Sequence, residues 1–199
     1  MAPFRLRRMP LRVLLFGILL LSSAQESIVA QGTVPGIRLA TRQFLSPEGN
    51  PYLEVQVEFM AEGMQWLMSR DSLVRAAALW TVVAYDSTGA VAGFSKATAR
   101  TGELAAAGDF VDIARIPLQS GPHVLELEVA DVALPDGTPL RHEAVIEIDT
   151  PNALDISDLF LVQGVAPAQE PATSLTRSGK EVLPLVDQRI SADGSSFLS

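Results

Sequence analysis

The strict alternation of apolar and polar side chains over residues 52–59 constrains the fold of this chain more than any other feature. The apolar positions are Leu53, Val55, Val57 and Phe59, and the polar positions are Glu54, Gln56 and Glu58. A repeat of two is the period of a β-strand with one buried face. We therefore expect a strand here, with its carboxylates on a solvated side.

Similar short segments continue along the chain and are separated by turn sequences. The other candidate strands cover residues 65–68, 76–85, 90–98, 110–116, 123–132, 140–149 and 156–162. Asp86-Ser-Thr-Gly89 and Pro135-Asp-Gly-Thr138 are strong turn signals between them. No segment has sustained helical periodicity. Seven or eight such strands predict an all-β fold, an antiparallel immunoglobulin-like β-sandwich.

The strand at residues 76–85 is apolar on both faces, unlike its neighbours. One face fits the core, where we expect Trp80 to lie. The other face needs a cover, which is either the C-terminal tail or the surface of a partner protein.

Residues 1–30 have the three zones of a secretory signal peptide. Four arginines within residues 5–12 precede the apolar run of residues 13–21, and small residues follow at 22–24. Nine apolar residues are too few to span a bilayer, which requires about 20. We expect cleavage after Ala24 or Ala30, and hence an exported protein of the bacterial periplasm or exterior.

The charge of the chain argues against nucleic-acid binding. The 199 residues carry a formal charge of −8, and the segment beyond residue 30, with 11 basic and 22 acidic residues, carries −11. Nucleic-acid binding requires a basic face instead. The absence of cysteine excludes disulfides, thiolate metal sites and thiol nucleophiles, and in an exported chain it favours a bacterial source.

The composition divides the chain into three parts. Residues 1–30 are the expected signal peptide, residues 31–165 the β-sandwich domain, and residues 166–199 an extended tail or the start of a further, truncated domain. Pro167, Pro171 and Pro184, with serine, threonine and glycine between them, are the basis of the last assignment.

The sequence contains no recognisable catalytic motif. We therefore expect no enzyme, no catalytic residues, no cofactor and no metal site. His123 and His142 are the two histidines, and no G-x-S-x-G, H-E-x-x-H, P-loop or EF-hand sequence accompanies them. Three carboxylate pairs lie at alternating or same-face strand positions, which is typical of a solvated sheet face. They are Glu54 with Glu58, Glu126 with Glu128, and Glu143 with Glu147.

Two weaker binding hypotheses remain open. Tyr52, Trp66, Trp80 and Tyr85 could form a sugar-stacking face, as an accessory carbohydrate-binding domain or an envelope hydrolase would need. Asp149, Asp155 and Asp158 could supply oxygen ligands to Ca²⁺, although the chain lacks the D-x-D-x-D-G order.

Several stretches, taken in order, carry a family resemblance. They are residues 52–57 (YLEVQV), 83–89 (VAYDSTG), 116–118 (IPL), 121–131 (GPHVLELEVAD), 156–159 (ISDL) and 179–184 (GKEVLP). Together they resemble the N-terminal sandwich region of bacterial exported proteins that carry a GWxTD domain. The Gly-Trp-x-Thr-Asp segment itself is absent here. The resemblance implies an exported β-sandwich and transfers no catalytic residues.

The sequence therefore predicts a non-enzymatic, exported interaction or scaffolding module of the bacterial cell envelope. We expect a protein partner and no nucleic-acid partner. We also expect no integral membrane span after cleavage of the signal peptide. An accessory carbohydrate-binding domain or an envelope hydrolase is the alternative.

Overall fold

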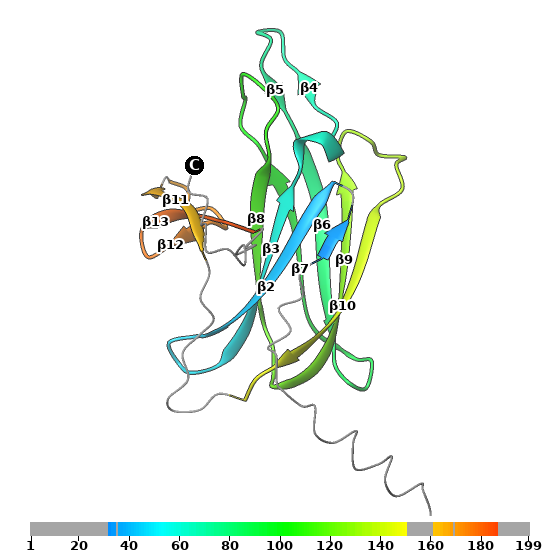
Figure 1. The fold of residues 1–199 in the computed structure, drawn as a ribbon, viewed down its shortest axis with the longest axis vertical. Coiled ribbons are helices and arrows are strands. Elements are labelled where there is room, and N and C mark those ends of the chain that lie inside the picture. The colour runs from blue at the N-terminus through cyan, green and yellow to red at the C-terminus, as the bar shows by residue number, and fades with distance from the viewer. Residues whose placement is uncertain (1–31, 35, 151–160, 169, 187–199) are drawn as a thin grey trace, which may run out of the picture.

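The computed structural model describes residues 32–34, 36–150, 161–168 and 170–186, and Figure 1 shows their arrangement. The expected signal peptide and most of the expected strand at residues 156–162 lie outside these residues. Within them the fold is all-β and antiparallel, with one short 3-10 turn, η1 (Ala61–Gly63), and no α-helix. The predicted fold class is confirmed at this level.

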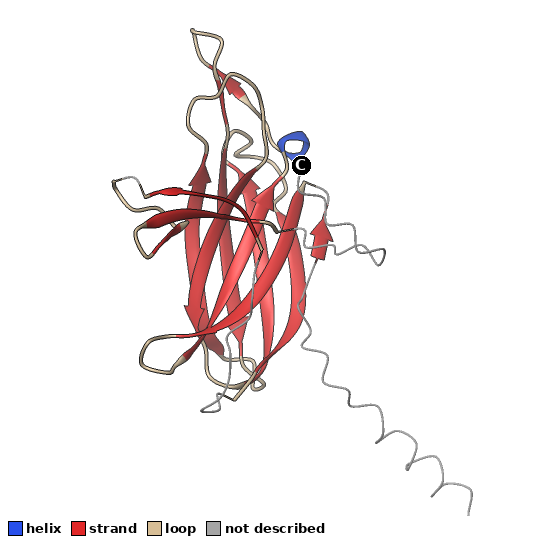
Figure 2. Ribbon diagram, turned by 60° about the vertical axis from the view of Figure 1, so that its left-hand side comes forward, coloured by secondary structure: helices blue, strands red, loops and turns tan. Residues whose placement is uncertain are grey.

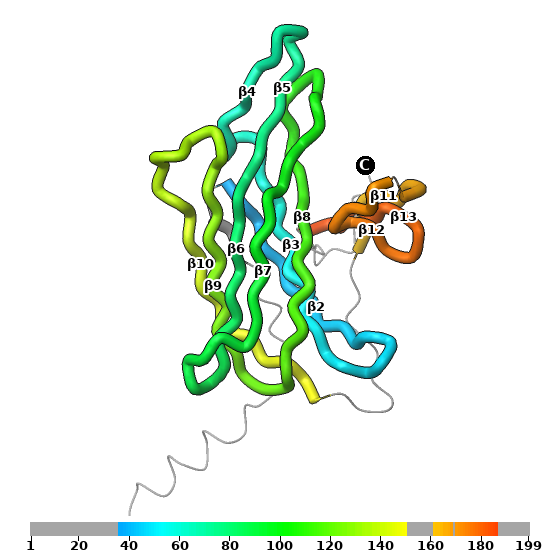
Figure 3. Tube along the Cα trace, turned by 180° about the vertical axis from the view of Figure 1, so that it is seen from behind, coloured from blue at the N-terminus to red at the C-terminus, as the bar shows by residue number. Residues whose placement is uncertain are grey.

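Two four-stranded sheets form the body of the molecule. The first has the order β1-β2-β3-β8, with bounds Gly32–Val34, Ile37–Leu45, Pro51–Phe59 and Phe110–Pro117. The second has the order β10-β9-β6-β7, with bounds Leu140–Ile148, Gly121–Asp131, Ala77–Tyr85 and Val91–Arg100. The strand of residues 37–45 was not among those predicted from the sequence. The hairpin β4 (Leu67–Met68) and β5 (Val74–Arg75) extends from one end of this body (Figure 3).

Side chains from both sheets share one hydrophobic core. Leu53, Val55, Val57 and Phe59 of β3 are at most 1% exposed, so the predicted inward face of this strand is confirmed. Ala78, Trp80, Val82 and Ala84 of β6 meet them from the second sheet. Burying one large apolar side chain contributes about 1.5–3 kcal/mol, so this core is the main source of stability.

Gly93 allows β7 and β8 to approach closely at one corner of the core. A Cβ atom at this position would lie 2.6 Å from Cγ2 of Ile116 and 3.3 Å from the carbonyl oxygen of Pro117. Only glycine fits such a contact without displacing its neighbours. The two sheets are therefore joined tightly along this side.

A third, smaller sheet follows the body in the chain, where the sequence predicts an extended tail. It has the order β11-β13-β12, with bounds Val162–Pro167, Lys180–Pro184 and Thr176–Arg177. Ser178 and Gly179 connect β12 to β13 in a two-residue turn and both have positive φ. Such a turn favours a hairpin, which explains why residues 176–184 fold back. Figure 2 shows these strands running crosswise to those of the body.

Candidate functional site

The outer face of the first sheet is not solvated where the sequence predicts solvent. Glu54 and Gln56 of β3 are 0% exposed, and the Glu58 side chain is 16% exposed. The expectation that this carboxylate side faces water is therefore wrong for Glu54 and Gln56. The alternation identified the strand and its inward face correctly, but the opposite face is buried as well.

Glu54 is compensated by hydrogen bonds and by two arginines. Its Oε2 atom accepts from Nε of Arg115, 3.1 Å away on the neighbouring strand β8, and forms an ion pair with Nη2 of Arg177. Its Oε1 atom accepts from Nε2 of Gln56 at 2.9 Å. A buried carboxylate requires such partners, because an unpaired charge is costly in a medium of low dielectric constant.

The C-terminal sheet provides the cover. Arg177 of β12 reaches Glu54, and its Cζ atom lies 4.9 Å from the ring centroid of Phe44 on β2. Ser174 donates a hydrogen bond to Oδ1 of Asp112 on β8. Pro184 is also fully buried, and the sheet lies beside β3 and β8 in Figures 1 and 3. The described part of the tail therefore contacts the first sheet, and the contacts found for it do not involve the two-sided apolar strand β6.

The outer face of the second sheet is open. Val83 of β6 is paired with Phe94 of β7, whose side chain is 69% exposed, and Val145 of β10 is 64% exposed. Val91 of β7 is also exposed. These exposed side chains, together with Val83, give the outer face of the second sheet an apolar component.

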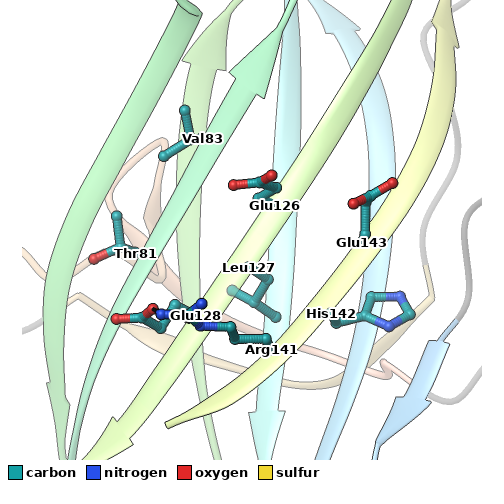
Figure 4. Close-up of a pocket in the computed structure, with 8 residues that line it drawn as sticks. All are labelled: Thr81, Val83, Glu126, Leu127, Glu128, Arg141, His142 and Glu143. Carbon is teal, nitrogen blue, oxygen red and sulfur yellow. Dashed lines mark hydrogen bonds and ion pairs between the residues drawn. The ribbon is translucent and has the colours of Figure 1, made fainter.

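A shallow groove crosses this open face between β6, β9 and β10 (Figure 4). The residues that line it are Thr81, Val83, Glu126, Leu127, Glu128, Arg141, His142 and Glu143. Glu128 forms an ion pair with Arg141 at 2.8 Å. Glu126 and Glu143 are exposed and stand directly opposite each other in the β9–β10 register. Like charges at opposed positions of a sheet destabilise it, so the groove has an unfavourable concentration of negative charge.

Tyr85 borders the same face and is electrostatically coupled to the groove. Burial raises the pKa of its hydroxyl, and the hydrogen bond to Oε2 of Glu126, at 3.2 Å, together with the charge of that carboxylate raises it further. The hydroxyl therefore remains a neutral donor to Glu126.

The two histidines lie on the inward register of β9 and β10. His123 is buried, with Nδ1 2.9 Å from the carbonyl oxygen of Gly121, and it pairs with Ile146 in the sheet. His142 pairs with Leu127 and borders the groove. Among the described residues, no hydrogen bond found here joins either imidazole to a nucleophile or to a carboxylate.

The four aromatic residues considered as a sugar-stacking face are not brought together. Trp80 is 1% exposed in the core, as predicted, and its Nε1 atom donates to Asp112 at 2.8 Å. Trp66 donates to the carbonyl oxygen of Ala61 and packs edge-on against Phe110. Tyr52 stacks on Phe44 on the covered face, whereas Tyr85 borders the open one.

The remaining predictions concern metals and membranes. Asp155 and Asp158 lie outside the described residues, so the structure gives no account of the calcium hypothesis. Within the described part of the chain, no group of three or more histidine, aspartate or glutamate side chains is placed to hold a metal ion. In that same part, no helix has the length and apolar character needed to cross a membrane.

The comparisons with known proteins add no family. The chain matches no protein-family model and no curated protein.

Sequence reasoning missed the burial of Glu54 and located the open face only in part, on the strand of residues 76–85. Arg115 and Arg177 lie 62 residues apart in sequence, and nothing in either local pattern indicates that both reach Glu54. Phe94 and Val145 each interrupt a polar side of their own strand. Combining those interruptions with the two-sided strand β6 would have indicated the open apolar face.

Proposed function

We propose that this chain is an exported, non-enzymatic interaction module with an immunoglobulin-like β-sandwich, and that it binds a protein partner through the open face of the sheet β10-β9-β6-β7. The observation that carries the proposal is the asymmetry of the two outer faces. The first is covered by the chain's own C-terminal sheet, whereas the second exposes Phe94 and Val145 beside a groove of carboxylates.

The chemistry of this face indicates the character of its partner. The apolar side chains favour a contact that excludes water. The opposed carboxylates of Glu126 and Glu143 favour a partner that brings lysine or arginine, because a cation between them would relieve their repulsion. A segment with apolar and basic side chains satisfies both requirements.

The placement in the bacterial envelope rests on the sequence. The basic, apolar and small-residue zones of residues 1–30 support export, and the absence of cysteine supports a bacterial source. The resemblance of residues 36–199 to the sandwich region of GWxTD-domain proteins supports export of a β-sandwich.

A capture experiment with matched variants tests the proposal. The purified protein is immobilised and exposed to bacterial envelope extract, in parallel with the double variant Phe94→Ser/Glu143→Lys and with the control Glu48→Lys, which changes an exposed turn. We expect a protein that binds the natural chain and the control, fails to bind the double variant, and is released at about 0.5 M NaCl, where exposed charges are screened. An identical set of captured proteins for all three chains would contradict the proposal.

A further inference from the structure

The residues that hold Arg177 have the composition of a receptor for a guanidinium group. The carboxylate of Glu54 is fully buried and accepts from this arginine, and the ring of Phe44 lies 4.9 Å from its Cζ atom. Tyr52 supports that ring by stacking, with the centroids 5.6 Å apart. A carboxylate beside an aromatic face distinguishes arginine from lysine, since the planar guanidinium both donates in a fork and stacks.

An unused acceptor lies beside this carboxylate. Gln56 is fully buried, and its Nε2 atom donates to Glu54 at 2.9 Å. Its Oε1 atom has no hydrogen-bond partner among the described residues. A buried amide oxygen is normally satisfied, so this atom is an acceptor that a further donor close to Glu54 would satisfy.

The residues that hold Arg177 belong to the large main body, whereas Arg177 itself belongs to the small C-terminal sheet. Glu54, Gln56 and Phe44 lie on the nine-residue strands β2 and β3 of the main body, whereas Arg177 lies on a sheet whose strands have 6, 5 and 2 residues. Strands this short supply few contacts of their own, so much of the stability of this sheet comes from packing against the body. Such units open at a lower free energy than the body that supports them.

The contacts between the two parts include polar ones, although Pro184 and Val186 at the end of the small sheet are buried. They include an ion pair to Glu54, a hydrogen bond from Ser174 to Asp112 and the stacking of Arg177 on Phe44. Polar contacts of this type are typical of interfaces between units that move relative to each other.

We propose that the small sheet β11-β13-β12, described over residues 162–168 and 170–186, is a displaceable cover, and that the site beneath it binds an arginine side chain of a partner protein when the cover opens. Arg177 is then the intramolecular occupant of an arginine site made by Phe44, Glu54 and Gln56. This site lies on the sheet opposite to the open face, and the inference therefore goes beyond the proposed function.

Reversing the charge of Arg177 tests whether the cover opens. In full-length Arg177→Glu, the new carboxylate faces Glu54 and should release the C-terminal sheet. We expect amide hydrogen exchange in β11 and β13 to accelerate at least about tenfold while β3 and β6 stay protected, as befits a local opening. The milder Arg177→Lys should give a smaller acceleration. The control Arg141→Glu, on the open face, should leave exchange in β11 and β13 unchanged.

A peptide then tests the specificity of the uncovered site. The probe is a labelled peptide of residues 173–184, compared with the same peptide carrying lysine in place of its arginine. Fluorescence anisotropy with full-length Arg177→Glu should give a dissociation constant for the arginine peptide at least about tenfold lower than for the lysine peptide. Binding should be weak to the natural chain, whose cover is closed, and to Arg177→Glu/Phe44→Ala.

Three results would overturn the inference. The first is unchanged protection of β11 and β13 in Arg177→Glu, which would mean that Arg177 does not hold the cover. The second is loss of protection throughout the body in both Arg177→Glu and Arg177→Lys, which would make the contact part of the global fold. The third is equal or absent binding of the two peptides to the opened chain, which would exclude an arginine-selective site.

Discussion

The outer faces of the two main sheets have similar sequences and opposite environments. On β3, Glu54 is completely buried and paired with two arginines. On β9 and β10, Glu126 and Glu143 are exposed and face each other across the sheet. Both faces show the same alternation of apolar residues with carboxylates, yet one is an internal interface and the other is an outer surface.

The difference arises from a segment distant in sequence. Arg177 is 123 positions from Glu54, and with Ser174 it brings the C-terminal sheet against β3 and β8. Within the described part of the chain, this sheet makes no hydrogen bond, ion pair or ring contact with Phe94 or Val145. A strand pattern therefore determines which residues face the shared core, whereas the environment of the opposite face depends on the rest of the chain.

The largest expected effect comes from removing a carboxylate on each face. Glu54→Ala leaves Arg115 and Arg177 without their shared partner, so it should lower the free energy of unfolding by about 3–5 kcal/mol, as breaking a buried ion pair does. Glu143→Ala should change it by less than about 0.5 kcal/mol, the usual size for an exposed position. Denaturant unfolding of both variants measures the difference. An equal loss of unfolding free energy in the two variants would contradict the conclusion that Glu54 is buried and Glu143 is exposed.

An aromatic residue on each face gives the next effect. Phe44→Ala removes the stacking with Tyr52 and the contact with Arg177, and should cost about 1–2 kcal/mol, since an aromatic pair and a cation–π contact contribute about 0.5–1.5 and 0.5–1 kcal/mol. Phe94→Ala should be nearly neutral in stability, because its ring is already in water. Thermal unfolding compares the stability of the two variants. A larger loss of stability from Phe94→Ala than from Phe44→Ala would contradict the conclusion that the first face is covered and the second is open.

Charge reversal within the groove should stabilise the protein slightly. Glu143→Lys replaces the opposed pair of carboxylates with a cross-strand ion pair to Glu126, which is worth about 0.2–1 kcal/mol. The same change should weaken partner binding, so stability and binding should move in opposite directions. Destabilisation by Glu143→Lys, measured by urea unfolding, would show that the two carboxylates do not repel each other.

The smallest effect concerns the turn that joins β6 to β7. Hydrogen bonds from Thr88 first, and then from the Ala90 amide, lower the pKa of Asp86 below its ordinary value of 3.8. The stability that ionised Asp86 contributes to the folded protein is therefore fully present above that value. It is lost as the pH falls through the lowered pKa. Asp86→Asn should be slightly less stable than the natural chain near neutral pH, with the gap closing in acid. A gap that widens below pH 3.8 would contradict this sign.

The sequence predicted the strands whose inward positions are mostly apolar. β3, β6 and β9 lie close to the predicted ranges, and Leu53, Val57 and Phe59 face the core as expected. β2 was missed because Thr41 and Gln43 occupy inward positions and weaken its alternation. The C-terminal hairpin was missed because Ser178 and Gly179 were taken as part of a tail, although both have the positive φ that a tight turn uses.

The candidate surfaces were less accessible to sequence reasoning than the fold. The two-sided character of residues 76–85 indicated that something must cover or contact β6, and its outer face is indeed open beside Phe94. The burial of Glu54 could not be inferred, because it depends on partners from β8 and β12 that local patterns do not connect.

Carboxylate labelling of the native protein tests the central claim most directly. A carbodiimide with a small amine modifies accessible carboxylates, and mass spectrometry reports each position separately. Our account predicts rapid modification of Glu126 and Glu143 and protection of Glu54, with that protection lost in Arg177→Glu. Modification of Glu54 at the same rate as Glu143 in the natural chain would contradict it.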